Sequence, residues 1–108
     1  INYPGSSIEN DFGWAPMHPV VEAYKSYQQM PYDRPTWDLT SVLYSVEGPS
    51  YFNVSPAGKI NVTDQGATEF TPDAAGNRYY LTVDSIQAEN IKQHFVQLLT
   101  KQPAHFNK

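Results

Sequence analysis

Apolar side chains recur at helical spacing in three segments of the chain, which predicts three helices. The first segment follows His18, with Pro19 at a position where a first helical turn tolerates proline, and its apolar face is Val20, Ala23, Tyr24 and Tyr27. The second, "RPTWDLTSVLYSVEGP", repeats at i, i+3, i+4 and i+7 through Leu39, Val42, Leu43 and Val46. The third has a face of Ile91, Phe95, Leu98 and Leu99.

Helix boundaries follow from the residues that flank these faces. Pro31 ends the first helix, and Thr36 is placed to cap a second helix that starts at or just beside Trp37 and Asp38. Gly48-Pro49 stops that second helix. Asp84 with Gln87 three residues later forms a capping-box pattern at the start of the third.

Between the second and third predicted helices, the spacing of apolar residues is no longer that of a helix. The stretches "YFNV", "KINVT", "ATEFT" and "RYYLTV" are rich in β-formers and are separated by turn residues. They predict two or three antiparallel strands in a meander. The first 17 residues, with Gly, Pro, Ser and Asn between isolated aromatics, predict an ordered loop or a short strand entering a loop.

Residues 1–108 therefore form a single segment which, taken alone, has α+β character, with about three helices and a small antiparallel β-meander. The chain begins with Ile1, which indicates a processed chain or a part of something longer. Many functions are compatible with this fold class.

Composition excludes two classes of partner. The net charge is −4 and the seven basic residues do not cluster, so a nucleic acid is not expected. No apolar run is long enough to cross a bilayer, so we expect a soluble protein without a membrane partner. The absence of cysteine fits a cytoplasmic or a periplasmic location equally well.

Three groups of residues could have a function, but a chance occurrence or a structural role explains each of them better. His18, His94 and His105 are too scattered for a metal site. Asn53-Val54-Ser55 and Asn61-Val62-Thr63 match the glycosylation sequon, but this pattern is common by chance. The tyrosines could form a carbohydrate-binding platform, although packing explains most of them: Tyr24, Tyr27, Tyr44, Tyr51, Tyr79 and Tyr80.

Trp37 and Asp38, directly before the second apolar run, permit two interpretations. In the structural one, Asp38 stabilises the helix macrodipole by roughly 0.3 to 1 kcal/mol and Trp37 covers the core beneath the helix. In the functional one, the pair is the edge of a binding site. Local physics alone favours the structural interpretation.

The blocks "MHPVVEAYKSY", "RPTWDLTSVLYSV", "YFNVSPAGKINVTDQGATEF" and "RYYLTV" together resemble the C-terminal part of the inosine-uridine preferring nucleoside hydrolase family. The resemblance covers about residues 18–83 and rests on the order and spacing of the blocks. It implies an α/β parent fold and a calcium-dependent hydrolase of purine metabolism. Such a glycosidase cleaves the N-glycosidic bond of a ribonucleoside to give ribose and free base.

By this resemblance Asp38 is a ligand of the bound calcium ion, and Trp37 is a substrate-binding residue that stacks on the base, as in the purine-preferring members. A carboxylate at a helix start suits Ca²⁺, which prefers hard oxygen ligands. The family's N-terminal aspartate cluster and its ribose-binding Asn and Glu have no counterpart in these 108 residues. We therefore expect no catalytic residue in this chain, no tight calcium binding and no activity by the chain alone.

The partners implied are a nucleoside substrate and the N-terminal part of the same fold. A rival hypothesis is a free-standing ligand-binding or interaction module that retains the fold without the chemistry. An incomplete sheet leaves strand edges and apolar patches exposed. We therefore also expect this chain to associate through these surfaces, including with further copies of itself as a homo-oligomer.

Overall fold

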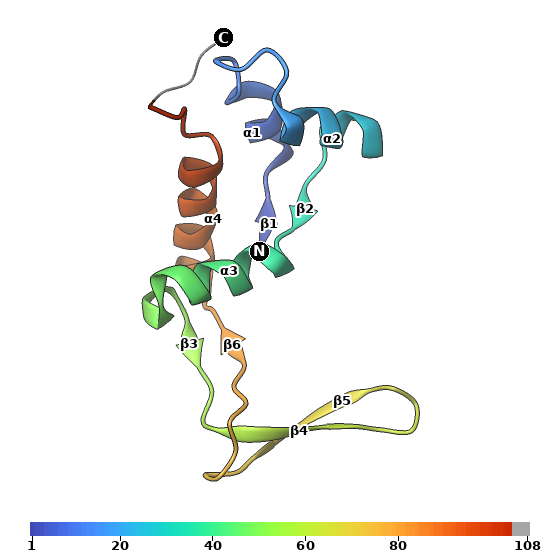
Figure 1. Ribbon diagram of the computed structural model, residues 1–108, viewed down its shortest axis with the longest axis vertical. Coiled ribbons are helices and arrows are strands. Elements are labelled where there is room, and N and C mark those ends of the chain that lie inside the picture. The colour runs from blue at the N-terminus through green and yellow to red at the C-terminus, as the bar shows by residue number, and fades with distance from the viewer. Residues whose placement is uncertain (105–108) are drawn as a thin grey trace.

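The structure, a computed structural model that describes residues 1–104, is a small α+β fold (Figure 1). It contains four α-helices: α1 (Gly5–Asn10), α2 (Pro19–Tyr27), α3 (Trp37–Glu47) and α4 (Ser85–Leu99), with a 3₁₀ turn η1 (Pro49–Tyr51) after α3. Its short strands pair as β1 (Asn2–Tyr3) with β2 (Arg34–Pro35), β3 (Asn53–Val54) with β6 (Leu81–Thr82), and β4 (Gly58–Val62) with β5 (Thr68–Pro72). All three pairs are antiparallel.

One small core joins the helices to the first strand pair. Ile8 of α1 and Ile91 of α4 are fully buried, and Leu43 connects α3 to them. Within residues 1–104 the buried apolar side chains are Tyr3, Ile8, Phe12, Leu43, Phe52, Ile91 and Phe95. This core fixes α3 against α4, and with it the position of the Trp37–Asp38 pair.

The strands after α3 form two nested hairpins in place of the predicted meander. β3 pairs with β6, which is far from it in the sequence. The chain between these two strands forms the β4–β5 hairpin. Pro56 lies between β3 and β4 and has no N–H to continue a ladder, which favours a bend there. The antiparallel pairing was predicted correctly, but the order of pairing was wrong.

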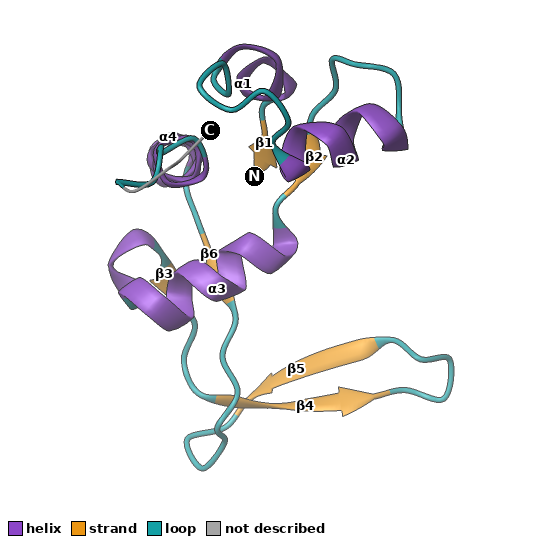
Figure 2. Ribbon diagram, turned by 45° about the horizontal axis from the view of Figure 1, so that its top comes forward, coloured by secondary structure: helices purple, strands orange, loops and turns teal. Residues whose placement is uncertain are grey.

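The β4–β5 hairpin extends away from the helices as an arm, which both views show (Figures 1 and 2). The molecule measures 52 × 31 × 26 Å with a radius of gyration of 17.6 Å. A compact domain of this length has a radius of gyration of about 13 Å. The chain is thus much more extended than an ordinary domain of its size.

The predicted helices are confirmed with small changes at their ends. α2 begins at Pro19 and α3 at Trp37, while Gly48 ends α3 with a positive φ of 81°. The capping box of α4 is complete, because Asp84 and Gln87 each accept a hydrogen bond from the other's backbone N–H. α1 was not predicted, since a six-residue helix in a Gly- and Ser-containing segment carries little periodic signal.

Within the described residues, none of these helices combines the length and the apolar character that a bilayer crossing requires.

Candidate functional site

The start of α3 is fixed to the first strand of the chain. Thr36 is almost fully buried, and both its backbone N–H and its Oγ1 donate to the carbonyl oxygen of Ile1, at 3.1 and 2.8 Å. The side chain therefore does not cap α3, contrary to the prediction. Its hydroxyl instead anchors the helix start, which leaves the next two side chains in a defined place.

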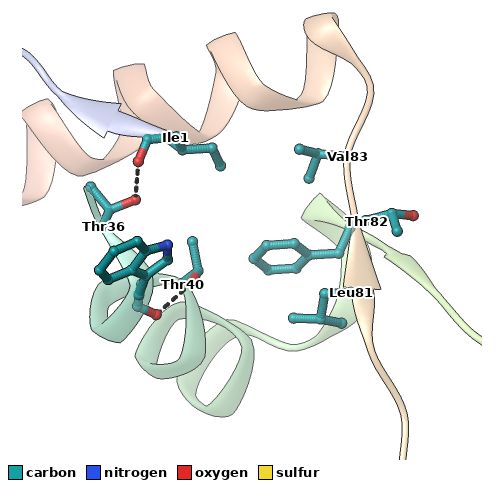
Figure 3. A pocket seen from close by; sticks show the side chains of 8 residues that line it. Ile1, Thr36, Thr40, Leu81, Thr82 and Val83 are labelled. Atoms are coloured by element: carbon teal, nitrogen blue, oxygen red, sulfur yellow. Dashed lines mark hydrogen bonds between the residues drawn. The ribbon is translucent and has the colours of Figure 1, made fainter. Parts of the chain in front are cut away.

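A cavity of about 190 Å³ lies beside this helix start. Ile1, Thr36 and Thr40 lie on one side of it, and Leu81 and Val83 face them from the strand that leads into α4 (Figure 3). Phe52 and Trp37 also line the cavity. Its walls are mostly apolar, with the hydroxyls of the threonines as the polar groups.

Trp37 is 80% exposed although it borders this cavity. An indole that covered the core beneath α3 would be largely buried, so Trp37 does not cover the core formed by the described residues. Thr40 Oγ1 donates to the Trp37 carbonyl oxygen at 2.7 Å, which ties the backbone of the first turn together. The indole is thus a large exposed ring on a fixed backbone, open to stacking by a flat ligand.

Asp38 is also exposed and lies in the first turn of α3. Consecutive helical residues point about 100° apart, so its carboxylate and the indole of Trp37 flank different sides of the helix start. Among residues 1–104 no three His, Asp or Glu side chains gather in a way that could hold a metal ion.

Two of the histidines have structural contacts. His18 accepts a hydrogen bond from the Val20 N–H at 3.2 Å, and its ring lies 4.5 Å from that of Phe12. His94 Nε2 lies 2.7 Å from Glu47 Oε2, and its ring stacks on Tyr51. His105 lies outside the described residues.

The exposed tyrosines come from different elements: Tyr27 from α2, Tyr44 from α3, and Tyr79 and Tyr80 from the segment between β5 and β6. The side chain of Asn53, in the first sequon, is hydrogen-bonded to Gln87.

Six residues of the cavity wall were not predicted from the sequence: Ile1, Thr40, Phe52, Leu81, Thr82 and Val83. The local sequence pattern does not predict that α3 lies near residues 40 positions later. This proximity depends on the pairing of β3 with β6. No family model, curated protein or solved structure matches the chain.

Proposed function

We propose that this chain is the C-terminal portion of a calcium-dependent ribonucleoside hydrolase that cleaves the N-glycosidic bond to give ribose and free base. The observation that carries the proposal is the exposure of two consecutive residues, Trp37 and Asp38, at an anchored helix start where Trp37 borders an apolar cavity. The sequence resemblance supplies the roles of the two residues, and their exposure supports those roles.

In this proposal Trp37 forms a wall on which the nucleobase stacks. Stacking of an aromatic side chain on a base is worth about 1 to 3 kcal/mol in single-stranded nucleic acids. Anchoring at Thr36 fixes the backbone that carries the ring before binding, which reduces the entropy lost when the base binds.

Asp38 by itself cannot complete a calcium site, because Ca²⁺ takes six to eight oxygen ligands. In residues 1–104 no group of three or more His, Asp or Glu side chains gathers in a way that could hold a metal ion. Asp38 is therefore proposed as one ligand of a site shared with the N-terminal part of the fold.

The test is fluorescence titration of the Trp14→Phe variant, in which Trp37 is the remaining tryptophan, since the chain has two. We expect purine nucleosides to quench Trp37 emission more than uridine or free ribose does. Equal quenching by all of these compounds would contradict a base-stacking role of Trp37. Quenching by a neutral quencher but by none of the nucleosides would contradict it too. The Asp38→Ala variant should keep the quenching, because the carboxylate does not hold the base.

Calorimetry of Ca²⁺ binding tests the second role. We expect no micromolar binding by the 108-residue chain. If the chain does bind Ca²⁺ at micromolar concentration, Asp38→Ala abolishes this binding and the control Glu69→Ala on the arm does not, then the chain holds a complete site. A free-standing binding module, the alternative function, predicts ligand binding by this chain without calcium.

A further inference from the structure

A second hollow lies in the part of the molecule where α2 is close to β2 (Figures 1 and 2). It has a volume of about 230 Å³ and is lined by Ala23, Tyr24, Tyr27, Tyr32 and Arg34. We call it the tyrosine–arginine pocket. It shares no lining residue with the cavity beside Trp37. A ligand bound here therefore occupies a separate site.

Three aromatic rings form the walls of this pocket. The rings of Tyr24 and Tyr32 stack with their centroids 5.1 Å apart, and the ring of Tyr27 lies 6.3 Å from that of Tyr32. The Tyr32 hydroxyl donates to the carbonyl oxygen of Tyr24, which ties the segment before β2 to α2. Tyr24 also packs against the core. The walls are therefore fixed to the rest of the molecule.

Arg34 is the one charged residue of the pocket wall, and its side chain has a defined position. The guanidinium lies over the Tyr27 ring, 4.6 Å from the ring centroid, and its Nη1 donates to the Tyr27 hydroxyl at 3.2 Å. Contact with the face of an aromatic ring is favourable for a guanidinium. The other guanidinium N–H groups have no acceptor among residues 1–104, so they are available to a ligand.

The positive charge of Arg34 is not neutralised by a direct partner. No carboxylate in residues 1–104 forms an ion pair with it. The preceding residue, Asp33, accepts the backbone N–H of Gly5 at 2.9 Å and lines a different hollow. On α2, the carboxylate of Glu22 lies 3.8 Å from Lys25 Nζ. The pocket therefore offers an uncompensated cation to a ligand, although the whole chain carries a net charge of −4.

The available donors and the rings define the chemistry of the ligand. A guanidinium can donate two parallel hydrogen bonds to the oxygens of a carboxylate or a phosphate. Because the Tyr27 oxygen accepts a hydrogen bond from Arg34, its own proton can be donated to the same anion. Flat tyrosine rings pack well against another aromatic ring. Sites for drug-sized ligands measure about 300–1,000 Å³, so this smaller pocket fits one ring with its anionic group.

We propose that the tyrosine–arginine pocket binds a small aromatic oxyanion, a single ring that carries a carboxylate or a phosphate group. Arg34 and the Tyr27 hydroxyl hold the oxyanion, and the tyrosine rings contact the ring of the ligand. This site goes beyond the proposed function and does not depend on it.

The test is an NMR titration of the isotope-labelled chain with benzoate, phenyl phosphate and the neutral benzamide. We expect both anions to produce saturable shifts at Tyr27 and Arg34, with a Kd of about 1 mM for ligands of this size. Benzamide should bind at least about tenfold more weakly, because its hydrogen bonds to Arg34 lack the charge of the anion. The anion that binds more tightly identifies the preferred group, carboxylate or phosphate.

Variants of the two anion-binding side chains test their roles. Arg34→Gln should weaken benzoate binding at least about tenfold, and Arg34→Lys should weaken it less, since lysine keeps the charge without the planar pair of donors. Tyr27→Phe keeps the ring and should weaken binding through the loss of the hydroxyl. Arg78→Gln is the matched control, because Arg78 is the other arginine of the chain and is also exposed. It should bind benzoate as the wild type does.

Circular dichroism checks that each variant is folded. If Arg34→Gln does not fold, Tyr27→Phe still tests the site, because Tyr27 is 65% exposed. The proposal would be overturned if neither anion caused saturable shifts at Tyr27 and Arg34 up to about tenfold above the expected Kd. Equal affinity for benzamide and benzoate would also overturn it, and so would an equal loss of binding in Arg34→Gln and Arg78→Gln.

Discussion

Asn53 and Gln87 exchange two hydrogen bonds between their side-chain amides, at 3.1 and 3.2 Å, although 34 residues separate them. The same Gln87 carbonyl oxygen accepts the backbone N–H of Asp84 at 2.9 Å. One side chain thus completes the capping box of α4 and joins that helix to β3, beside the cavity wall.

Gln87→Ala should lower the free energy of unfolding by about 1 kcal/mol, since it removes one half of a capping box and the link to β3. Chemical denaturation measures this difference. Gln93→Ala is the control, because Gln93 bonds only with Glu89 on the same helix face in a solvent-exposed pair. An equal effect of the two changes would show that the link to β3 contributes nothing.

Leu43→Ala should cost about 2 to 5 kcal/mol of stability, because Leu43 is 4% exposed at the centre of the core. Val46→Ala, one turn further along the same apolar stripe, should change stability by less than about 0.5 kcal/mol, since Val46 is 76% exposed. Both should be measured at a concentration where the chain is monomeric. Similar losses at the two positions would mean that the stripe is buried throughout.

Stability should fall in alkaline solution. Burial raises the pKa of Tyr3 and of Tyr24 above the ordinary value of 10.0, because it disfavours the charged phenolate. Both tyrosines therefore favour the folded state fully below pH 10.0, and this contribution is lost as the pH rises through the raised values. Absorbance titration of the phenolate should show two of the eight tyrosines ionising late.

Tyr3→Phe removes the 2.7 Å hydrogen bond to Ser7, whose buried hydroxyl loses its partner. We expect a loss of about 1 to 3 kcal/mol near neutral pH. The variant should also show one fewer late-ionising tyrosine. Neutral-pH stability equal to that of the wild type would contradict the role of this pair.

Gly76→Ala should destabilise the arm. A methyl group at Gly76 would clash with the backbone of Gly58, where β4 approaches Arg78. Gly13→Ala is the control, because a methyl group there meets nothing within 4 Å. Hydrogen exchange of the β4 and β5 amides should accelerate in the first variant and remain unchanged in the second.

Periodicity predicted three of the four helices because each combines a repeating apolar face with a recognisable start or stop, such as Pro19, Gly48 or the Asp84–Gln87 box. Pairing partners were harder to predict, since the choice between β4 and β6 as the neighbour of β3 depends on the path of the whole chain. Thr36 illustrates the same limit. Its hydroxyl could cap α3, but folding brings the Ile1 carbonyl within reach and that acceptor is used instead.

The sequence located Trp37 and Asp38 at the start of a helix, and α3 does begin at Trp37 with Asp38 in its first turn. The sequence could not predict that the indole is exposed, because exposure depends on which elements pack beside α3. The opposite wall of the cavity was missed for the same reason.

Among residues 1–104 the β3–β6 pair links the arm to the helices, and β4 and β5 pair with each other, with one further bridge between Gly58 and Arg78. Hydrogen bonds within the hairpin can therefore open while the helices keep their packing, which makes the arm a separate unit of local unfolding. A two-stranded hairpin by itself is barely stable in water. Limited proteolysis should consequently cut first in the turn between β4 and β5 and leave a helical remnant that stays folded.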